Sequence, residues 1–172
     1  LEVIDATLHA TKGGSIRVVA KHLGSLMRTN ERIDTILRHE IEQQIHEAKF
    51  YVEFSRAIDR ARHELRAMLD ELKVKGSRIV GYGASHSTTT LIYHFGLSGY
   101  LDYLVDDNPA KHGRYSPGLH LPVLSSNQLS EDKPSHVLIL AWPYFEAIVS
   151  RNTNYTRGGG KFIVPLPDLT II

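Results

Sequence analysis

The sequence predicts an α/β fold, in which a Rossmann-like, mainly parallel sheet with flanking helices is preceded by a β-hairpin and a long helical linker. From Arg78 onward, short apolar runs alternate with helical stretches, which is typical of parallel strands joined by helical crossovers. Between residues 30 and 75 there is no proline and no glycine, which favours uninterrupted helix. Residues 3–20 carry two strand-like segments around a turn. We therefore expect three parts: residues 1–28, 29–76 and 77–172.

The hairpin is predicted from two β-branched segments, Val3 to Ala10 and Ile16 to Ala20, which flank the turn Thr11-Lys12-Gly13-Gly14. A hairpin of two strands is only marginally stable in water. We therefore expect residues 1–28 to be the edge of a larger sheet, and the chain to begin inside a longer protein.

The linker, residues 29–76, is predicted to begin at a cap formed by Thr29 and Asn30 and to stop at Gly76. Apolar residues recur along it at helical spacing. We expect either one very long helix or two helices with a bend near Lys49 to Val52. Packing or self-association explains the apolar stripe, and binding to a membrane or a partner helix is the alternative.

The last part, residues 77–172, contains four apolar runs that we predict to be strands. Helices are expected between the first two runs, over Ser87 to Phe95, and later around Leu129 and Tyr144 to Ser150. The predicted strands are Ile79–Tyr82, Leu101–Val105, Val137–Ala141 and Lys161–Val164.

Composition excludes several classes of function. Lysine and arginine number 20 against 19 for aspartate and glutamate, so no strong field attracts nucleic acid or an anionic membrane. The absence of cysteine fits a reducing compartment, and we expect a soluble, cytoplasmic protein. Each His-Glu pair of the linker lacks the second histidine of a zinc-protease motif, and no metal site is expected in this chain.

The segment with the clearest chemical signal follows the first predicted strand and opens a helix. It reads Gly81-Tyr82-Gly83-Ala84-Ser85-His86-Ser87. Glycines at such a turn let backbone N–H groups approach a phosphate at the helix start. His86 occupies the place of the third glycine of the dinucleotide-binding pattern. Binding of a nucleotide and a plain tight turn therefore both remain open, and a hydride-carrying NAD is not favoured.

Acidic and basic residues follow the second predicted strand. Asp106 lies about 20 residues after the glycines, where a Rossmann unit places the acid that holds ribose hydroxyls. A polar turn ending at Pro109 is the alternative. Lys111, with its basic neighbours His112 and Arg114, forms either an anion clamp or a solvated loop. We expect the carboxyl ends of the strands to bring four residues to one crevice: Gly83, Ser85, Asp106 and Trp142.

Several runs resemble one known family, in the same order along the chain. They are Gly81–Ala84, Val105–Gly118, Leu121–Val123, Leu138–Trp142 and Gly159–Pro167, together with Thr11–Val18 in the hairpin. The chain resembles the carboxy-terminal region of the S-adenosylmethionine-dependent sugar C-methyltransferases.

The resemblance implies a Rossmann-like end domain that orients a nucleotide-linked ketosugar and packs against an upstream methyltransferase domain of the same chain. Residues 1–28 would then be a remnant of that domain. S-adenosylmethionine would bind the parent protein and zinc its amino-terminal lobe, so this chain alone is expected to be inactive and to bind neither. No residue here is expected to be catalytic. Those expected to bind substrate or nucleotide are Gly81, Gly83, Ala84, Ser85, His86, Ser87, Asp106, Lys111 and Trp142.

Two other functions remain open from the sequence. The chain could be a stand-alone module that binds a nucleotide or nucleotide-sugar without catalysis. It could also be a scaffold that forms a homodimer through the hairpin or the long helix. The sequence does not identify the sugar or the carbon that the parent enzyme would methylate.

Overall fold

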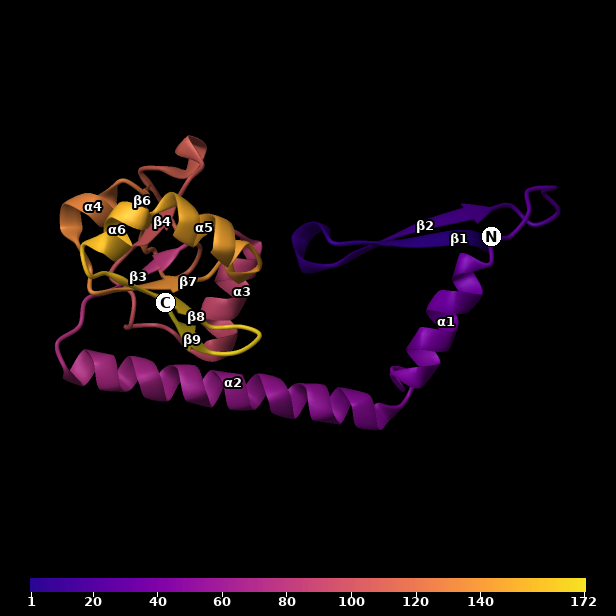
Figure 1. The fold of residues 1–172 in the computed structure, drawn as a ribbon, viewed down its shortest axis with the longest axis horizontal. Helices are drawn as coiled ribbons and strands as arrows, with labels where there is room; N and C mark the ends of the chain where they lie inside the picture. Colours follow the sequence, from indigo (N-terminus) through magenta and orange to yellow (C-terminus); the bar gives the residue numbers. More distant parts are fainter. The chain divides into compact units, whose positions relative to one another are not determined.

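The computed structural model describes residues 1–172, except for the side chain of Lys12. The chain divides into two compact units, residues 1–57 and residues 58–172. A mostly parallel sheet of seven strands lies in the second unit and an antiparallel pair of strands in the first (Figure 1). The predicted α/β class is therefore confirmed.

The first unit is a hairpin with a helix packed on one of its strands. Strands β1 (Glu2–His9) and β2 (Ser15–Lys21) pair in antiparallel register across the short helix η1 (Thr11–Gly13). Helix α1 (Arg32–Glu42) lies against β1, where the Arg32 guanidinium donates to both oxygens of Asp5 at 3.0 and 2.6 Å. Ile4 and Ala6 are the buried apolar residues of this unit among those described.

The predicted linker forms two helices, and the predicted position of the bend, Lys49 to Val52, is wrong. Helix α2 (Ala48–Val74) runs through that segment, and the break lies at residues 43–47. Gln44 adopts a left-handed conformation with φ of 56°. Its N–H donates to Ile41 O and the next N–H to Glu40 O, which is the hydrogen-bond pattern of a Schellman C-cap.

Helix α2 ends as predicted. Gly76 has a φ of 72° and its N–H donates to Lys73 O, while the Ser77 N–H donates to Leu72 O. A second Schellman cap therefore ends α2 at the predicted glycine, because glycine adopts this conformation without a steric penalty.

The sheet of the second unit has the strand order of a Rossmann unit. The order is β5-β6-β4-β3-β7-β8-β9, so the first strand, β3, lies at the centre, and the five strands from β6 to β8 are parallel. The edge strands β5 and β9 are antiparallel. The bounds are β3 Ile79–Tyr82, β4 Leu104–Asp106, β5 Arg114–Tyr115, β6 Pro122–Ser125, β7 His136–Ile139, β8 Lys161–Val164 and β9 Thr170–Ile171.

Helices cover both faces of this sheet (Figure 1). On one face, Leu65 and Leu69 of α2 pack with apolar residues of α3 (His86–Phe95). On the other face, the core includes Leu129 of α4, Ile148 of α5 and Tyr155 of α6. These helices span Gln128–Asp132, Phe145–Arg151 and Thr153–Arg157, and two further short helices are η2 Pro109–Lys111 and η3 Trp142–Tyr144.

No helix in the described chain is both long enough and apolar enough to cross a membrane.

Candidate functional site

Strand β3 and the loop after it contain two glycines that a side chain could not easily replace, for different reasons. Gly81 lies within β3, and a Cβ there would come within 2.6 Å of Leu104 and 2.7 Å of Leu140. Gly83 has a φ of 111°, and a Cβ there would lie 2.9 Å from the Cβ of Ala141. Gly81 therefore serves core packing, and Gly83 lets the ends of β3 and β7 approach closely.

Ser85 caps helix α3. Its Oγ accepts a hydrogen bond from the Thr88 N–H at 3.4 Å and lies 2.9 Å from the Oγ of Ser87. Ser85, His86 and Ser87 are all exposed. The N–H groups of His86 and Ser87 begin the helix, where no preceding turn can accept from them, so they face the position at which helix starts bind anions.

Asp106, at the end of β4, is buried and bonded within the protein. Its Oδ2 accepts from the Ala84 N–H at 2.8 Å and from Lys111 Nζ at 2.8 Å, and its Oδ1 accepts from the Asn108 N–H at 2.9 Å. Burial alone would raise the pKa of Asp106, but these three bonds outweigh burial and hold the pKa below its usual value. Asp106 therefore ties the glycine loop to the turn at residues 108–111.

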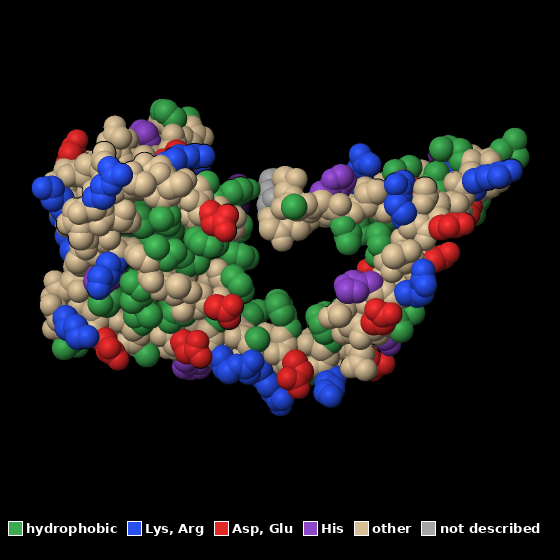
Figure 2. All heavy atoms as spheres, viewed as in Figure 1, with side chains coloured by type: hydrophobic (Ala, Val, Ile, Leu, Met, Phe, Trp, Pro, Cys, Tyr) green, Lys and Arg blue, Asp and Glu red, His purple; other side chains and the backbone are tan. Residues whose placement is uncertain are grey.

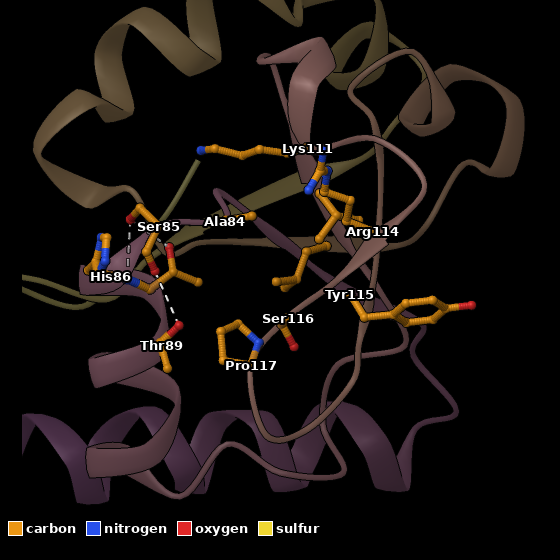
Figure 3. A pocket seen from close by; sticks show the side chains of 12 residues that line it. Ala84, Ser85, His86, Thr89, Lys111, Arg114, Tyr115, Ser116 and Pro117 are labelled. Atoms are coloured by element: carbon orange, nitrogen blue, oxygen red, sulfur yellow. Dashed lines mark hydrogen bonds between the residues drawn. The ribbon is translucent and has the colours of Figure 1, made fainter.

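A hollow of about 340 Å³ opens beside this loop, between the start of α3 and strand β5 (Figure 3). Its apolar floor includes Leu104 and Val123. Hydroxyls and cations border it, and in Figure 3 the Lys111 side chain extends toward the Ala84–Ser85 loop. The remaining residues that line it are Ala84, Ser85, His86, Thr88, Thr89, Lys111, Arg114, Tyr115, Ser116 and Pro117.

A second, smaller hollow of about 220 Å³ lies between the ends of β3, β4 and β7 and helix α5. Here Tyr82 donates to Asp107 at 2.6 Å, and the guanidinium of Arg151 donates to the same carboxylate at 3.1 Å. Burial, followed by the bond to Asp107, raises the pKa of Tyr82 to about 12. The Tyr82 hydroxyl is therefore a neutral donor at physiological pH.

The structure divides the four residues predicted to share one crevice. Ser85 lines the larger hollow, whereas Gly83 and Asp106 line the smaller one. Trp142 lines neither and packs against the apolar core on the α2 and α3 face. The space at the ends of β3 and β7, where a Rossmann unit usually admits its ligand, is therefore only the smaller hollow, which Gly83 and Ala141 both line.

The residues predicted to bind substrate or nucleotide thus have different surroundings. Ala84, Ser85, His86 and Lys111 line the larger hollow, while Ser87 hydrogen-bonds to Ser85 at its border. Gly81 is enclosed in the sheet. Strand β5 and the following loop supply the opposite wall, of which only Arg114 was predicted, as part of a possible anion clamp. Ser116 and Pro117 belong to this wall, and their turn sequence was the available signal.

The two cations of the larger hollow differ in their partners. Lys111 is paired with Asp106 at 2.8 Å. Arg114 is exposed and has no ion pair with any side chain that the structure describes. Nor does the described part of the chain gather three or more histidine or acidic side chains that could hold a metal ion. The arrangement is therefore suited to holding an anionic molecule against an apolar floor.

Comparison with known proteins assigns the chain to a family. The family described as "C-methyltransferase C-terminal domain" matches residues 10–167. C-methyltransferase NovU of Streptomyces niveus is 30% identical over 173 residues, which cover 100% of this chain and 41% of that protein. The chain therefore spans less than half the length of this curated relative. Because the family match extends over most of the sequence, the chain belongs to the C-methyltransferase C-terminal domain family.

Proposed function

We propose that this chain is the substrate-orienting carboxy-terminal part of an enzyme that transfers a methyl group to a carbon of a nucleotide-linked ketosugar. The larger hollow carries the proposal. The exposed cation Arg114 and the start of α3 lie on its border, where they suit the phosphate groups of a nucleotide. Its apolar floor suits the ring of the nucleotide. The family relationship supports methyl transfer as the reaction of the longer protein.

S-adenosylmethionine is the methyl donor that we propose for the longer protein, and the Rossmann-like unit does not fit it. In a Rossmann unit, an acidic side chain at this position accepts a hydrogen bond from a ribose hydroxyl. Both oxygens of Asp106 are bonded to Ala84, Asn108 and Lys111, and Gly83 packs against Ala141. We therefore place the donor site outside this chain, and we place the zinc lobe outside it as well.

In the proposed reaction, a base outside this chain removes the proton from the carbon next to the keto group, and that carbon then takes the methyl group. The contribution of this chain is to fix the nucleotide end of the substrate, so that the sugar is held in one orientation. Such positioning removes entropy before the reaction and can contribute several orders of magnitude in rate.

We infer that the hairpin joins the upstream methyltransferase domain. All described residues of β2 except Lys21 are exposed, and hydrophobic side chains are visible along the hairpin in Figure 2. Ile16 and Val18 are each 52% exposed. A second copy of the chain is the alternative partner. Light scattering would distinguish them: a dimer that dissociates on Val18→Lys would favour the second copy.

Calorimetric titration of the chain tests the proposed function, with thymidine diphosphate, thymidine diphosphate glucose and S-adenosylmethionine as probes. We expect the two nucleotides to bind with a dissociation constant of about 0.1–1 mM, because this chain supplies only part of the site. We expect no saturable binding of S-adenosylmethionine below about 0.1 mM. Binding of the cofactor but not of the nucleotides would contradict the proposal.

A stand-alone nucleotide-binding module would use the same hollow. Binding of thymidine diphosphate at about 1 µM would favour that alternative, since the site would then be complete within this chain. Arg114→Gln, compared with the control Arg157→Gln at an exposed position of α6, locates the binding in either case.

A further inference from the structure

Asp106 occupies the position of a ribose-binding acid but lies in a different environment. Its side chain is only 12% exposed, and its oxygens accept from two backbone N–H groups and one ammonium. These three bonds use three of the roughly four acceptor sites of the carboxylate, which leaves about one for a ligand hydroxyl. Asp106 lines the smaller hollow, but its partner Lys111 lines the larger hollow that we propose to bind an anion.

Lys111 and Arg114 consequently act on a ligand with different strength. Lys111 Nζ lies 2.8 Å from Asp106 Oδ2, so the two opposite charges largely cancel at a distance. Arg114 lies on the edge strand β5, is exposed, and has no acidic partner among the described side chains. An anion in the hollow therefore meets one uncompensated positive charge.

We propose that Asp106 is a positioning residue that compensates Lys111 and anchors the loop at Ala84, and that Arg114 is the residue that provides the net charge for anion binding. The proposal rests on the function proposed above, because it assigns roles at the same hollow. In this proposal, Asp106 lowers the affinity for an anionic ligand, whereas a ribose-binding acid would raise it. Removal of a ribose-binding carboxylate weakens nucleotide binding, whereas removal of a compensating carboxylate strengthens the binding of anions.

Affinity measurements on the full chain test the sign of this effect, with thymidine diphosphate and inorganic pyrophosphate as probes. We expect Asp106→Asn to tighten binding of both probes about three- to tenfold, since Lys111 is then released as a second net charge. Arg114→Gln should weaken binding about tenfold, and Lys111→Met less than about threefold. The controls are Arg157→Gln and Lys75→Met, the latter removing a lysine that is also paired, with Glu71.

The salt dependence of binding provides a measurement that loss of folding would not imitate. The slope of log affinity against log salt follows the number of uncompensated charges that contact the ligand. We expect a steeper slope for Asp106→Asn, a flatter slope for Arg114→Gln and little change for Lys111→Met. If Asp106→Asn weakened both probes, or Lys111→Met cost more than about tenfold, the proposal would be overturned.

A double-mutant cycle in urea unfolding separates this proposal from the proposed function. Asp106→Asn, Lys111→Met and the double variant should show a coupling of at least about threefold in the unfolding constant. If no variant bound either probe but the coupling were present, the proposed function and the role of Arg114 would be refuted while the pairing of Asp106 with Lys111 would stand. Absence of coupling would refute the pairing itself.

Discussion

Charged residues differ between the two ends of the parallel strands, which are the amino edge and the carboxyl edge of the seven-stranded sheet. At the amino edge, where the parallel strands begin, Arg78 pairs with Asp102 at 3.1 Å and with Asp132 at 3.0 Å, and Lys73 lies 3.5 Å from Asp102. At the carboxyl edge, Arg114 has no acidic partner among the described residues. Arg78 and Lys73 therefore join segments at the amino edge, as Lys111 and Arg151 do at the carboxyl edge, whereas Arg114 is left without an ion pair among the described side chains.

Packing at the amino edge supports this distinction. The Arg78 guanidinium lies over the ring of Tyr103, 5.7 Å from its centroid. Burial, followed by the proximity of Asp132, raises the pKa of Tyr103, so the phenol stays neutral. These contacts connect the segments before β3, β4 and β7. We therefore expect substitutions at the amino edge to affect stability and those at the carboxyl edge to affect binding.

The largest expected effect on stability is an exception to this rule, at Gly83 of the carboxyl edge. Gly83→Ala should lower the free energy of unfolding by about 3 kcal/mol, because the φ of 111° disfavours a side chain and the added Cβ meets Ala141. Gly99, with φ of 85° and open space around it, gives the matched control. Gly99→Ala should cost about 1 kcal/mol from backbone strain alone. Urea unfolding measures both, and equal costs would disprove the steric part.

A comparison of two arginines tests the distinction between the edges directly. Arg78→Gln removes two ion pairs and a contact with an aromatic ring, and should cost about 1.5 kcal/mol after allowance for its 48% exposed side chain. Arg114→Gln should change stability by less than about 0.5 kcal/mol. Chemical denaturation of both variants measures the difference. A larger cost at Arg114 than at Arg78 would show that the edges do not differ in this way.

The sequence predicted those elements whose pattern is local. β3, β7 and β8 are buried apolar runs between turn signals, and they were located within one or two residues. The predicted strand at Leu101 begins only at Leu104. Strands β5, β6 and β9 were not predicted, because they are short and mix polar with apolar residues, and only pairing with a neighbour makes them strands.

The limits at the site and in the linker have the same physical origin. The glycine loop and the helix after it follow from adjacent residues, so the sequence predicted both, although α3 begins at His86 and not at Ser87. The bond from Ala84 to Asp106 joins residues 22 positions apart and depends on the pairing of β3 with β4. At the break between α1 and α2, Gln44 takes the left-handed conformation that glycine usually adopts at the end of a helix. Because no glycine is present there, the sequence did not indicate a C-cap at this position.

Acid should weaken the carboxyl edge through Asp106. Because the pKa of Asp106 in the folded state is lower than in the unfolded chain, its contribution to stability is complete above the unfolded value of about 3.9 and is lost as the pH falls further. We expect Asp106→Asn to lower the free energy of unfolding by about 1 kcal/mol at neutral pH. As the pH falls below about 4, the variant should lose less stability than the original chain does. Urea unfolding between neutral and acidic pH measures this. Parallel curves for the two proteins would refute the assignment.

The smallest expected effect concerns His136, which begins β7 at the amino edge. Burial, followed by the nearby charge of Lys161, lowers the pKa of His136, and one ring nitrogen lies 3.1 Å from the Ser135 hydroxyl. The unfolded chain therefore takes up a proton near pH 6.5 that the folded chain resists, so stability should fall as the pH drops through that value. His136→Gln removes this proton uptake, and the loss of stability between about pH 7.5 and 5 should shrink by at most about 1 kcal/mol. Urea unfolding across that range provides the measurement, with His94→Gln, a change at an exposed histidine of α3, as the control. Since the site lies at the opposite edge from the larger hollow, the affinity for thymidine diphosphate should stay the same, and a change in affinity would contradict the separation of the two edges.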